Sequence, residues 1–147
     1  MMTDPNPMAM KQAIAELRDV NKQKRRTAVM KLGMLGGDQA VRTLITVVTN
    51  HNEDLIVRGR AALMLGKLGD PLAVEPLIGA LDAPGYQTPL HAAQSLGKLG
   101  DLRAIEPLLR MMDASDQEHV REAARVSLQQ LGYDLNNNAQ PELEPEG

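Results

Sequence analysis

The chain has 147 residues, of which 43% are apolar, and a net charge of -3, which is ordinary for one domain large enough to bury a core. Cysteine is absent, which excludes a disulfide framework, a thiolate nucleophile and a thiolate metal site. No basic start precedes an apolar run and no stretch reaches membrane-spanning length, so we expect a cytoplasmic protein that does not insert into a membrane.

The first predicted element is a helix at Met8–Asp19, which follows seven residues, 1–7, that we expect to be flexible. Apolar residues recur within it at helical spacing. This helix resembles none of the repeat units that follow, and we expect it to cover the first of them as a terminal cap. Its apolar positions are Ala9, Ala13, Ile14 and Leu17.

A Leu-Gly-x-Leu-Gly motif, which we call the phrase, then recurs through the chain, and its last copy is degenerate. Its leading leucines, Leu32, Leu65, Leu96 and Leu128, follow one another after 33, 31 and 32 residues. Such a period is typical of stacked supersecondary units. An alanine stands four positions before each leading leucine, at Ala28, Ala61, Ala92 and Ala124. This column of small residues predicts closely packed helices.

Each unit is predicted to consist of a helix A that ends at the phrase, a tight turn, and an amphipathic helix B. The last glycine of the phrase suits the left-handed residue at a helix end, and Asp70 and Asp101 can cap the helix that follows. Pro76 and Pro107 are tolerable if they lie in the first turn of helix B. The sequence thus predicts an all-α, right-handed α-solenoid of about four helical hairpins over residues 8–132.

The segment after the last phrase, residues 133–147, differs from the repeats in composition. It contains four acidic residues, no basic residue, three consecutive asparagines and two prolines. Because so little apolar surface is available to bury, we expect an acidic disordered tail.

Two strings, residues 58–78 and 91–109, make the repeat more specific. They resemble the short HEAT repeats found in phycobilin lyases and in many prokaryotic scaffold proteins, and the resemblance covers roughly residues 24–132. It implies an α-solenoid whose leading function is a non-catalytic scaffold or assembly subunit that holds a protein partner. An accessory factor that handles tetrapyrrole chromophores for a light-harvesting or redox complex is the alternative.

A local motif at residues 88–93 also fits the Thr-Pro-Leu-His-x-Ala signature of an ankyrin repeat. The other three units do not carry it at this place. A shortened loop, with Thr88 as N-cap and Pro89 as first helical residue, explains it locally. We therefore favour the HEAT-like interpretation, and β-hairpin fingers between the helix pairs would contradict it.

The candidate binding surface is the B-helix side, which we expect to line a concave face. Aligned units place variable residues in two polar rows and leave an apolar rail of Val47, Ala80 and Met111 beside them. Tyr86 lies in the one loop that breaks the pattern, and tyrosine is favoured at interface hot spots. The predicted partner-binding residues are Arg42, Thr46, Glu75, Gly79, Glu106, Arg110, Met111 and Tyr86.

A basic patch at the head of the array consists of Lys22, Lys24, Arg25 and Arg26. It could dock an anionic partner, nucleic acid included. We favour an ordinary solvated helix start, because the net charge is negative and no aromatic residue interleaves the patch.

Catalytic and metal sites find no support in the sequence. The three histidines, His51, His91 and His119, stand in different units, without a second histidine at the spacing of a metal face. Some HEAT-like enzymes bind two irons through repeated His-Glu pairs, which this chain lacks. We therefore expect no cofactor and no metal, another protein as the partner, and possible self-association through the ends of the solenoid.

Overall fold

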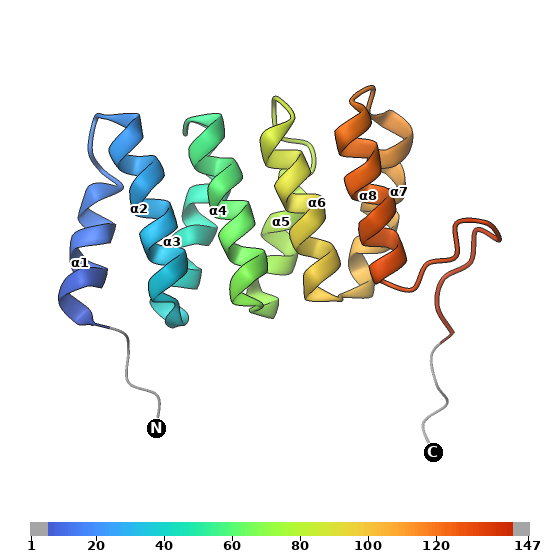
Figure 1. The fold of residues 1–147 in the computed structure, drawn as a ribbon, viewed down its shortest axis with the longest axis horizontal. Coiled ribbons are helices and arrows are strands. Elements are labelled where there is room, and N and C mark those ends of the chain that lie inside the picture. Colours follow the sequence, from blue (N-terminus) through green and yellow to red (C-terminus); the bar gives the residue numbers. More distant parts are fainter. Residues whose placement is uncertain (1–5, 143–147) are drawn as a thin grey trace, which may run out of the picture.

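The computed structural model describes residues 6–142, which fold into helices joined by short connections (Figure 1). None of these helices is both long and apolar enough to cross a membrane. In chain order the elements are α1 (Pro7–Glu16), α2 (Lys22–Leu35), α3 (Gly37–Val48), α4 (Leu55–Leu68), the 3-10 turn η1 (Pro71–Ala73), α5 (Val74–Ala80), α6 (Gln87–Leu99), the 3-10 turn η2 (Leu102–Ala104), α7 (Ile105–Ala114) and α8 (Glu118–Gln130).

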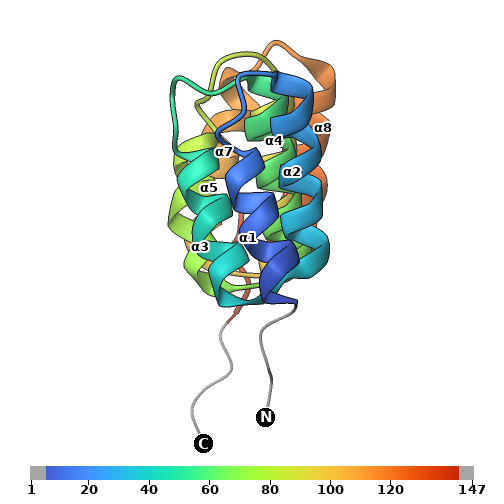
Figure 2. The same ribbon diagram turned by 90° about the vertical axis from the view of Figure 1, so that its left-hand side faces the viewer.

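The helices form two layers (Figures 1 and 2). Helices α2, α4, α6 and α8 stand side by side in what we call the A layer, and α3, α5 and α7 form the B layer behind it. Helix α1 covers the N-terminal end of the row, which confirms the predicted cap. The all-α solenoid is confirmed, but the fourth unit contains only its first helix within the described residues. No β-hairpin finger separates the helix pairs of residues 6–142, as the HEAT-like interpretation requires.

The predicted turn chemistry is confirmed. Gly69 and Gly100 end α4 and α6 in the left-handed conformation, with φ of 72° and 74°. The carboxylates of Asp70 and Asp101 each accept a hydrogen bond of 2.9 Å from the backbone N–H two residues on. Pro76 lies in the first turn of α5, where a missing N–H has no partner to lose.

Consecutive A helices approach each other at the first glycine of the phrase. A Cβ on Gly66 would lie only 2.8 Å from the Cα of Ser95 in α6, so a side chain has no room there. The hydroxyl of Ser95 donates to the carbonyl oxygen of Ala62 at 2.7 Å, and that of Ser127 donates to Ala93 at 2.6 Å. The leading leucines and the column of alanines are fully buried beside these contacts. The phrase is therefore both a helix end and an interhelical contact.

In α2, α4 and α8, an arginine stands seven positions before the leading leucine. It donates a hydrogen bond to the backbone of the segment that precedes the helix. The Arg58 side chain is 2% exposed, and its Nε donates to the Val48 carbonyl at the end of α3. Arg25 and Arg121 donate in the same way to Asp19 and to Ser115. Burial lowers the pKa of Arg58. The recurrent arginine is thus mainly a structural residue of the repeat.

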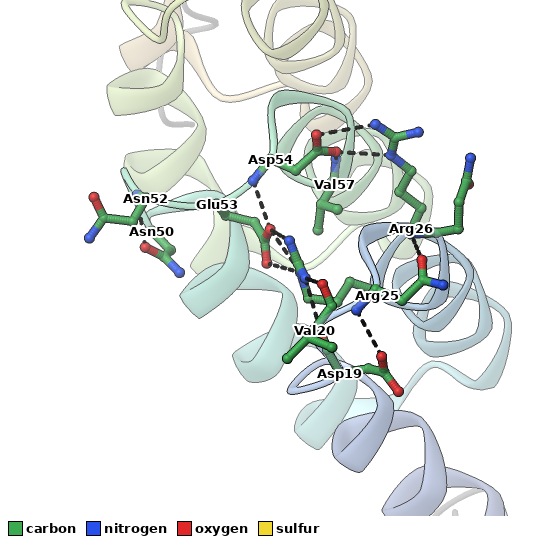
Figure 3. Close-up of polar contacts among 11 residues, drawn as sticks. Asp19, Val20, Arg25, Arg26, Asn50, Asn52, Glu53, Asp54 and Val57 are labelled. Carbon is green, nitrogen blue, oxygen red and sulfur yellow. Dashed lines mark hydrogen bonds and ion pairs between the residues drawn. The ribbon is translucent and has the colours of Figure 1, made fainter.

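A charged network joins the start of α2 to the connection before α4 (Figure 3). Arg25 donates from Nε to Glu53 at 3.0 Å, and Arg26 donates from Nε to Asp54 at 2.9 Å. Asp54 also accepts from the backbone N–H of Val57 as the N-cap of α4. The hydrogen bond from Arg26 is the largest cause that holds the pKa of Asp54 below its usual range.

Both ends of the domain differ from the predicted boundaries. Asn6 caps α1 by accepting from the N–H of Met8, so the helix begins inside the segment expected to be flexible. Tyr133 is buried, and Asp134 and Ala139 exchange two backbone hydrogen bonds that close a turn. The predicted disorder from residue 133 therefore does not describe 133–139, because Tyr133 packs on the core. Residues 1–5 and 143–147 lie outside the described residues.

The start of α6 also differs from the prediction. The helix begins at Gln87, and Thr88 is not its N-cap. The Thr88 side chain is buried instead, and its hydroxyl donates to the Leu55 carbonyl at the start of α4. This contact fixes the N-terminal halves of two neighbouring A helices against each other.

The contact at Gly66 predicts a pair of contrasting alanine variants. Gly66→Ala should destabilise the protein by about 1–3 kcal/mol, because its Cβ meets Ser95 in a filled interface. Gly79→Ala adds the same methyl group where no atom lies within 4 Å, and should be neutral or stabilising by up to about 1 kcal/mol. Urea denaturation followed by circular dichroism measures both. Equal effects of the two variants would contradict the close approach.

The Arg26–Asp54 pair predicts a pH-dependent contribution to stability. Because the folded-state pKa of Asp54 is lowered, its stabilisation is fully present above the ordinary value of about 3.9 and is lost as pH falls through the folded value. Asp54→Asn keeps a capping side chain and removes the charge. Its melting temperature should lie below the wild-type value at neutral pH and converge with it in acid. Asp82→Asn, at an exposed carboxylate with no partner among residues 6–142, is the control and should change little.

Candidate functional site

The predicted polar rows lie on the exposed side of the B layer, as expected from helical spacing. Some of their charges form local ion pairs. The Nε of Arg42 lies 2.8 Å from a carboxylate oxygen of Asp38, and a guanidinium nitrogen of Arg103 lies 2.9 Å from a carboxylate oxygen of Glu75. Both pairs are solvent-exposed, so they contribute little to stability. The exposed residues of these rows are Arg42, Thr46, Glu75, Gly79, Glu106 and Arg110.

The prediction that the apolar rail beside these rows forms part of a binding surface is wrong. Val47, Ala80 and Met111 are all buried, and Met111, a predicted contact residue, is only 9% exposed. Each follows an exposed residue by one position, and a step of 100° along a helix turns its side chain toward the A layer. The B-layer surface therefore offers polar contacts without an apolar anchor.

Ion pairs within the protein compensate part of the basic patch at the N-terminal end of the array. Arg25 and Arg26 are bound to Glu53 and Asp54, so their charges are largely compensated (Figure 3). Lys24 lies 3.7 Å from Asp19, with most of its side chain in solvent. Only the two lysines, Lys22 and Lys24, remain exposed as a candidate anion-binding surface.

A groove of about 720 Å³ lies between α6 and α8 in the A layer. Its volume falls in the range of ligand and hot-spot pockets. Tyr86 and Val126, 48% and 39% exposed, give it apolar walls, together with the half-buried Leu90. We call it the α6–α8 groove; its remaining lining residues are Gln94, Lys98, Gln117, His119, Glu122, Ala123, Ser127 and Gln130.

The position six residues before the leading leucine differs between the units beside this groove. In α4 it is Gly59, where a Cβ would lie 3.4 Å from the backbone of Gln87, so α6 approaches α4 closely there. In α6 the same position is Leu90, whose side chain lines the groove. This position alone would not have located the groove from the sequence, because α2 also has a long side chain there, Arg26, which pairs with Asp54.

Tyr86 lies where two hollows meet. Besides the α6–α8 groove it lines a second one of about 390 Å³, which also includes Pro89, Met111 and Val120. Its hydroxyl lies 3.5 Å from the Nε2 of Gln87, at the limit of a hydrogen bond. About half of the Tyr86 surface is exposed and able to contact a partner.

Within residues 6–142, the histidines and the buried serines form no hydrogen bond with one another. No three His, Asp or Glu side chains there are grouped in a way that could hold a metal ion. His91 contacts Gln94 through Nδ1 at 3.2 Å, and His119 lies apart from it on α8. The hydroxyls of Ser95 and Ser127 are buried donors to backbone carbonyls.

Comparison with known structures identifies similar folds. The chain is 27% identical to a chain of the complex of CpcE and CpcF of phycocyanin lyase from Nostoc sp. PCC7120, with a TM-score of 0.74 over 90% of this chain and 56% of that one. Human deoxyhypusine hydroxylase, in complex with glycerol, is 22% identical with a TM-score of 0.72, over 90% of this chain and 46% of that one. The chain spans about half the length of both proteins, and the second likeness shows the fold alone.

Comparison with sequence families gives the same assignment. No curated protein matches the chain. Residues 10–89 match the family model of HEAT repeats, and residues 90–114 match that of the PBS lyase HEAT-like repeat. The first match covers more than half of the chain and includes the whole of α2 to α5. The chain therefore belongs to the HEAT-repeat family.

Proposed function

We propose that this chain is a non-catalytic protein-binding scaffold or assembly subunit, and that its partner binds in the α6–α8 groove. The observation that carries this proposal is the combination of a hollow of about 720 Å³ with exposed apolar side chains at Tyr86 and Val126. Binding energy in protein interfaces concentrates on a few such anchors in pockets, surrounded by polar contacts. HEAT-like arrays commonly work through extended surfaces of this kind.

The groove is a better candidate than the B-layer rows for the main contact. Those rows keep Arg42, Glu106 and Arg110 in solvent, but the apolar residues beside them are buried. Exposed charges alone mainly influence association rate and specificity. We therefore place the main contact in the groove and not on the rows.

A tetrapyrrole-handling accessory factor is the second candidate function. It is favoured by the likeness to the CpcE–CpcF complex of phycocyanin lyase, at 27% identity. The groove volume is also compatible with a small-molecule site. Because the chain spans only about half the length of that relative, we keep this function as the alternative.

The groove proposal predicts the effect of two substitutions on partner recovery. Tyr86→Ala and Val126→Glu should each weaken binding by about 2 kcal/mol, or about 30-fold, because they remove or charge an anchor. The immobilised wild type and variants capture proteins from the native host, and mass spectrometry quantifies the partner that each retains. Both residues are exposed, so melting temperatures should change little.

Arg42→Glu and Arg110→Glu are the matched controls on the opposite layer and should leave recovery within a few-fold of the wild type. Loss of the partner with these controls, and not with the groove variants, would move the interface to the B layer. Unchanged recovery with all four variants would contradict both surfaces.

The alternative function predicts a spectroscopic signal. If the groove takes a chromophore, a purified phycobilin should bind saturably with a changed absorption spectrum, and Val126→Glu should abolish the change. No spectral change with the wild type would exclude this function for the isolated chain.

A further inference from the structure

The charges of this protein are segregated between its helices in a way that the proposed function does not explain. Helices α2, α4 and α6 together contain nine of the sixteen Lys and Arg residues of the chain and none of its nineteen Asp and Glu residues. Within residues 6–142 the acidic residues lie instead in α1, the B layer, α8, the connections and the segment after α8. A protein of net negative charge therefore has one cationic layer.

Part of this positive charge is compensated at the N-terminal end. Arg25 and Arg26 are bound by Glu53 and Asp54, and Lys31 lies 3.2 Å from Glu16 of α1. These pairs belong to the joints between the first helices. The excess of positive charge accordingly lies further along, on α4 and α6.

Three cations there have no carboxylate partner. None of the ion pairs formed within residues 6–142 involves Arg60, Lys67 or Lys98, and we call these three residues the cationic row. Uncompensated charges close together raise the local potential and attract an anionic group.

The cationic row leads into the α6–α8 groove. Arg60 and Lys67 are seven residues apart on α4, so they share one side of that helix and lie about 10 Å apart along its axis. Lys98 occupies in α6 the same place in the repeat as Lys67 in α4, and it lines the groove. Helices α4 and α6 are neighbours in the A layer (Figure 1). Because Lys67 and Lys98 hold the same place on these two neighbours, they extend the positive charge of α4 toward the groove.

We propose that the groove and the cationic row together bind an acidic amphipathic segment of a partner protein. Apolar side chains of the segment pack on Leu90 and Val126 inside the groove. Its carboxylates pair with Lys98 and Lys67, and with Arg60 where the segment is long enough. This inference rests on the proposed function and adds the chemistry of the partner to it.

The groove favours a protein segment over nucleic acid. Its walls are apolar at Leu90 and Val126, and such walls take the apolar side chains of a protein segment. Nucleic-acid channels also need aromatic platforms or a continuous basic track, whereas Tyr86 is the one aromatic residue lining the groove. An acidic segment with alternating apolar side chains can pair its carboxylates with the cationic row and pack its apolar side chains on the walls of the groove.

Fluorescence anisotropy with a defined probe tests the inference. The probe is a fluorescein-labelled helical peptide of Glu, Ala and Leu with its leucines on one face, and its counterpart carries Gln in place of Glu. The Glu peptide should bind the full chain saturably at low ionic strength, at least about tenfold more tightly than the Gln peptide, and more weakly as salt rises. No saturable binding of the Glu peptide would overturn the inference.

Charge reversal locates the site. The double variant Lys67→Glu/Lys98→Glu should weaken binding of the Glu peptide at least about tenfold. The matched double variant Arg42→Glu/Arg110→Glu changes the net charge equally on the B layer and should leave binding within about twofold. Equal losses in both would indicate a nonspecific charge effect and contradict a site. Tighter binding of a short DNA duplex, lost in the same A-layer variant, would replace the protein partner with nucleic acid.

The partner capture described above separates this inference from the proposed function. If Tyr86→Ala and Val126→Glu release the native partner while Lys67→Glu/Lys98→Glu retains it, the groove function stands and the acidic partner is wrong. If all three variants release the native partner, both the groove function and the acidic partner are supported. If the groove variants retain it, the proposed function fails, whatever the acidic peptide does.

Discussion

The close approach of consecutive A helices is the contact on which the rest of this array depends. Gly66 leaves room for Ser95, and the serine hydroxyl then donates to a carbonyl of the helix that carries the glycine. With the helices at this distance, the columns of leucine and alanine from successive units meet in one continuous core. The glycine, the hydroxyl and the apolar columns therefore act together, and the phrase that repeats along the sequence encodes a spacing between helices.

This spacing also determines which residues remain available for binding. Small residues occupy the flanks of the A helices, so long charged side chains on these helices point outward or toward the connections. The connections supply carboxylates that cap helices and hold arginines, as Asp54 does for both α4 and Arg26. Where no connection supplies a carboxylate, as at Lys67 and Lys98, the positive charge stays uncompensated. The residues available for binding are thus those that neither pack in the core nor pair with a connection.

The sequence was sufficient for features that depend on local chemistry. The repeat period, the left-handed glycines, the aspartate caps and the position of Pro76 follow from residues close in the chain, and the structure confirms them. The burial of Met111 depends on the rotation of α7, and the pairing of Arg25 depends on a carboxylate 28 residues away. The place of Tyr133 depends on how the chain leaves α8. Such features require distances between helices, which periodicity alone does not supply.

The exchange of Gly59 for Leu90 at equivalent positions has a consequence for how such arrays diversify. At the joints after α4 and α6, a glycine and serine contact near the end of the helix holds the helices together, while the position six residues before the leucine is glycine in one and leucine in the other. A substitution at that position therefore changes the side chain that faces the joint while the glycine and serine contact keeps its residues. In such an array, a point mutation can alter the surface at one joint with no insertion and no new element.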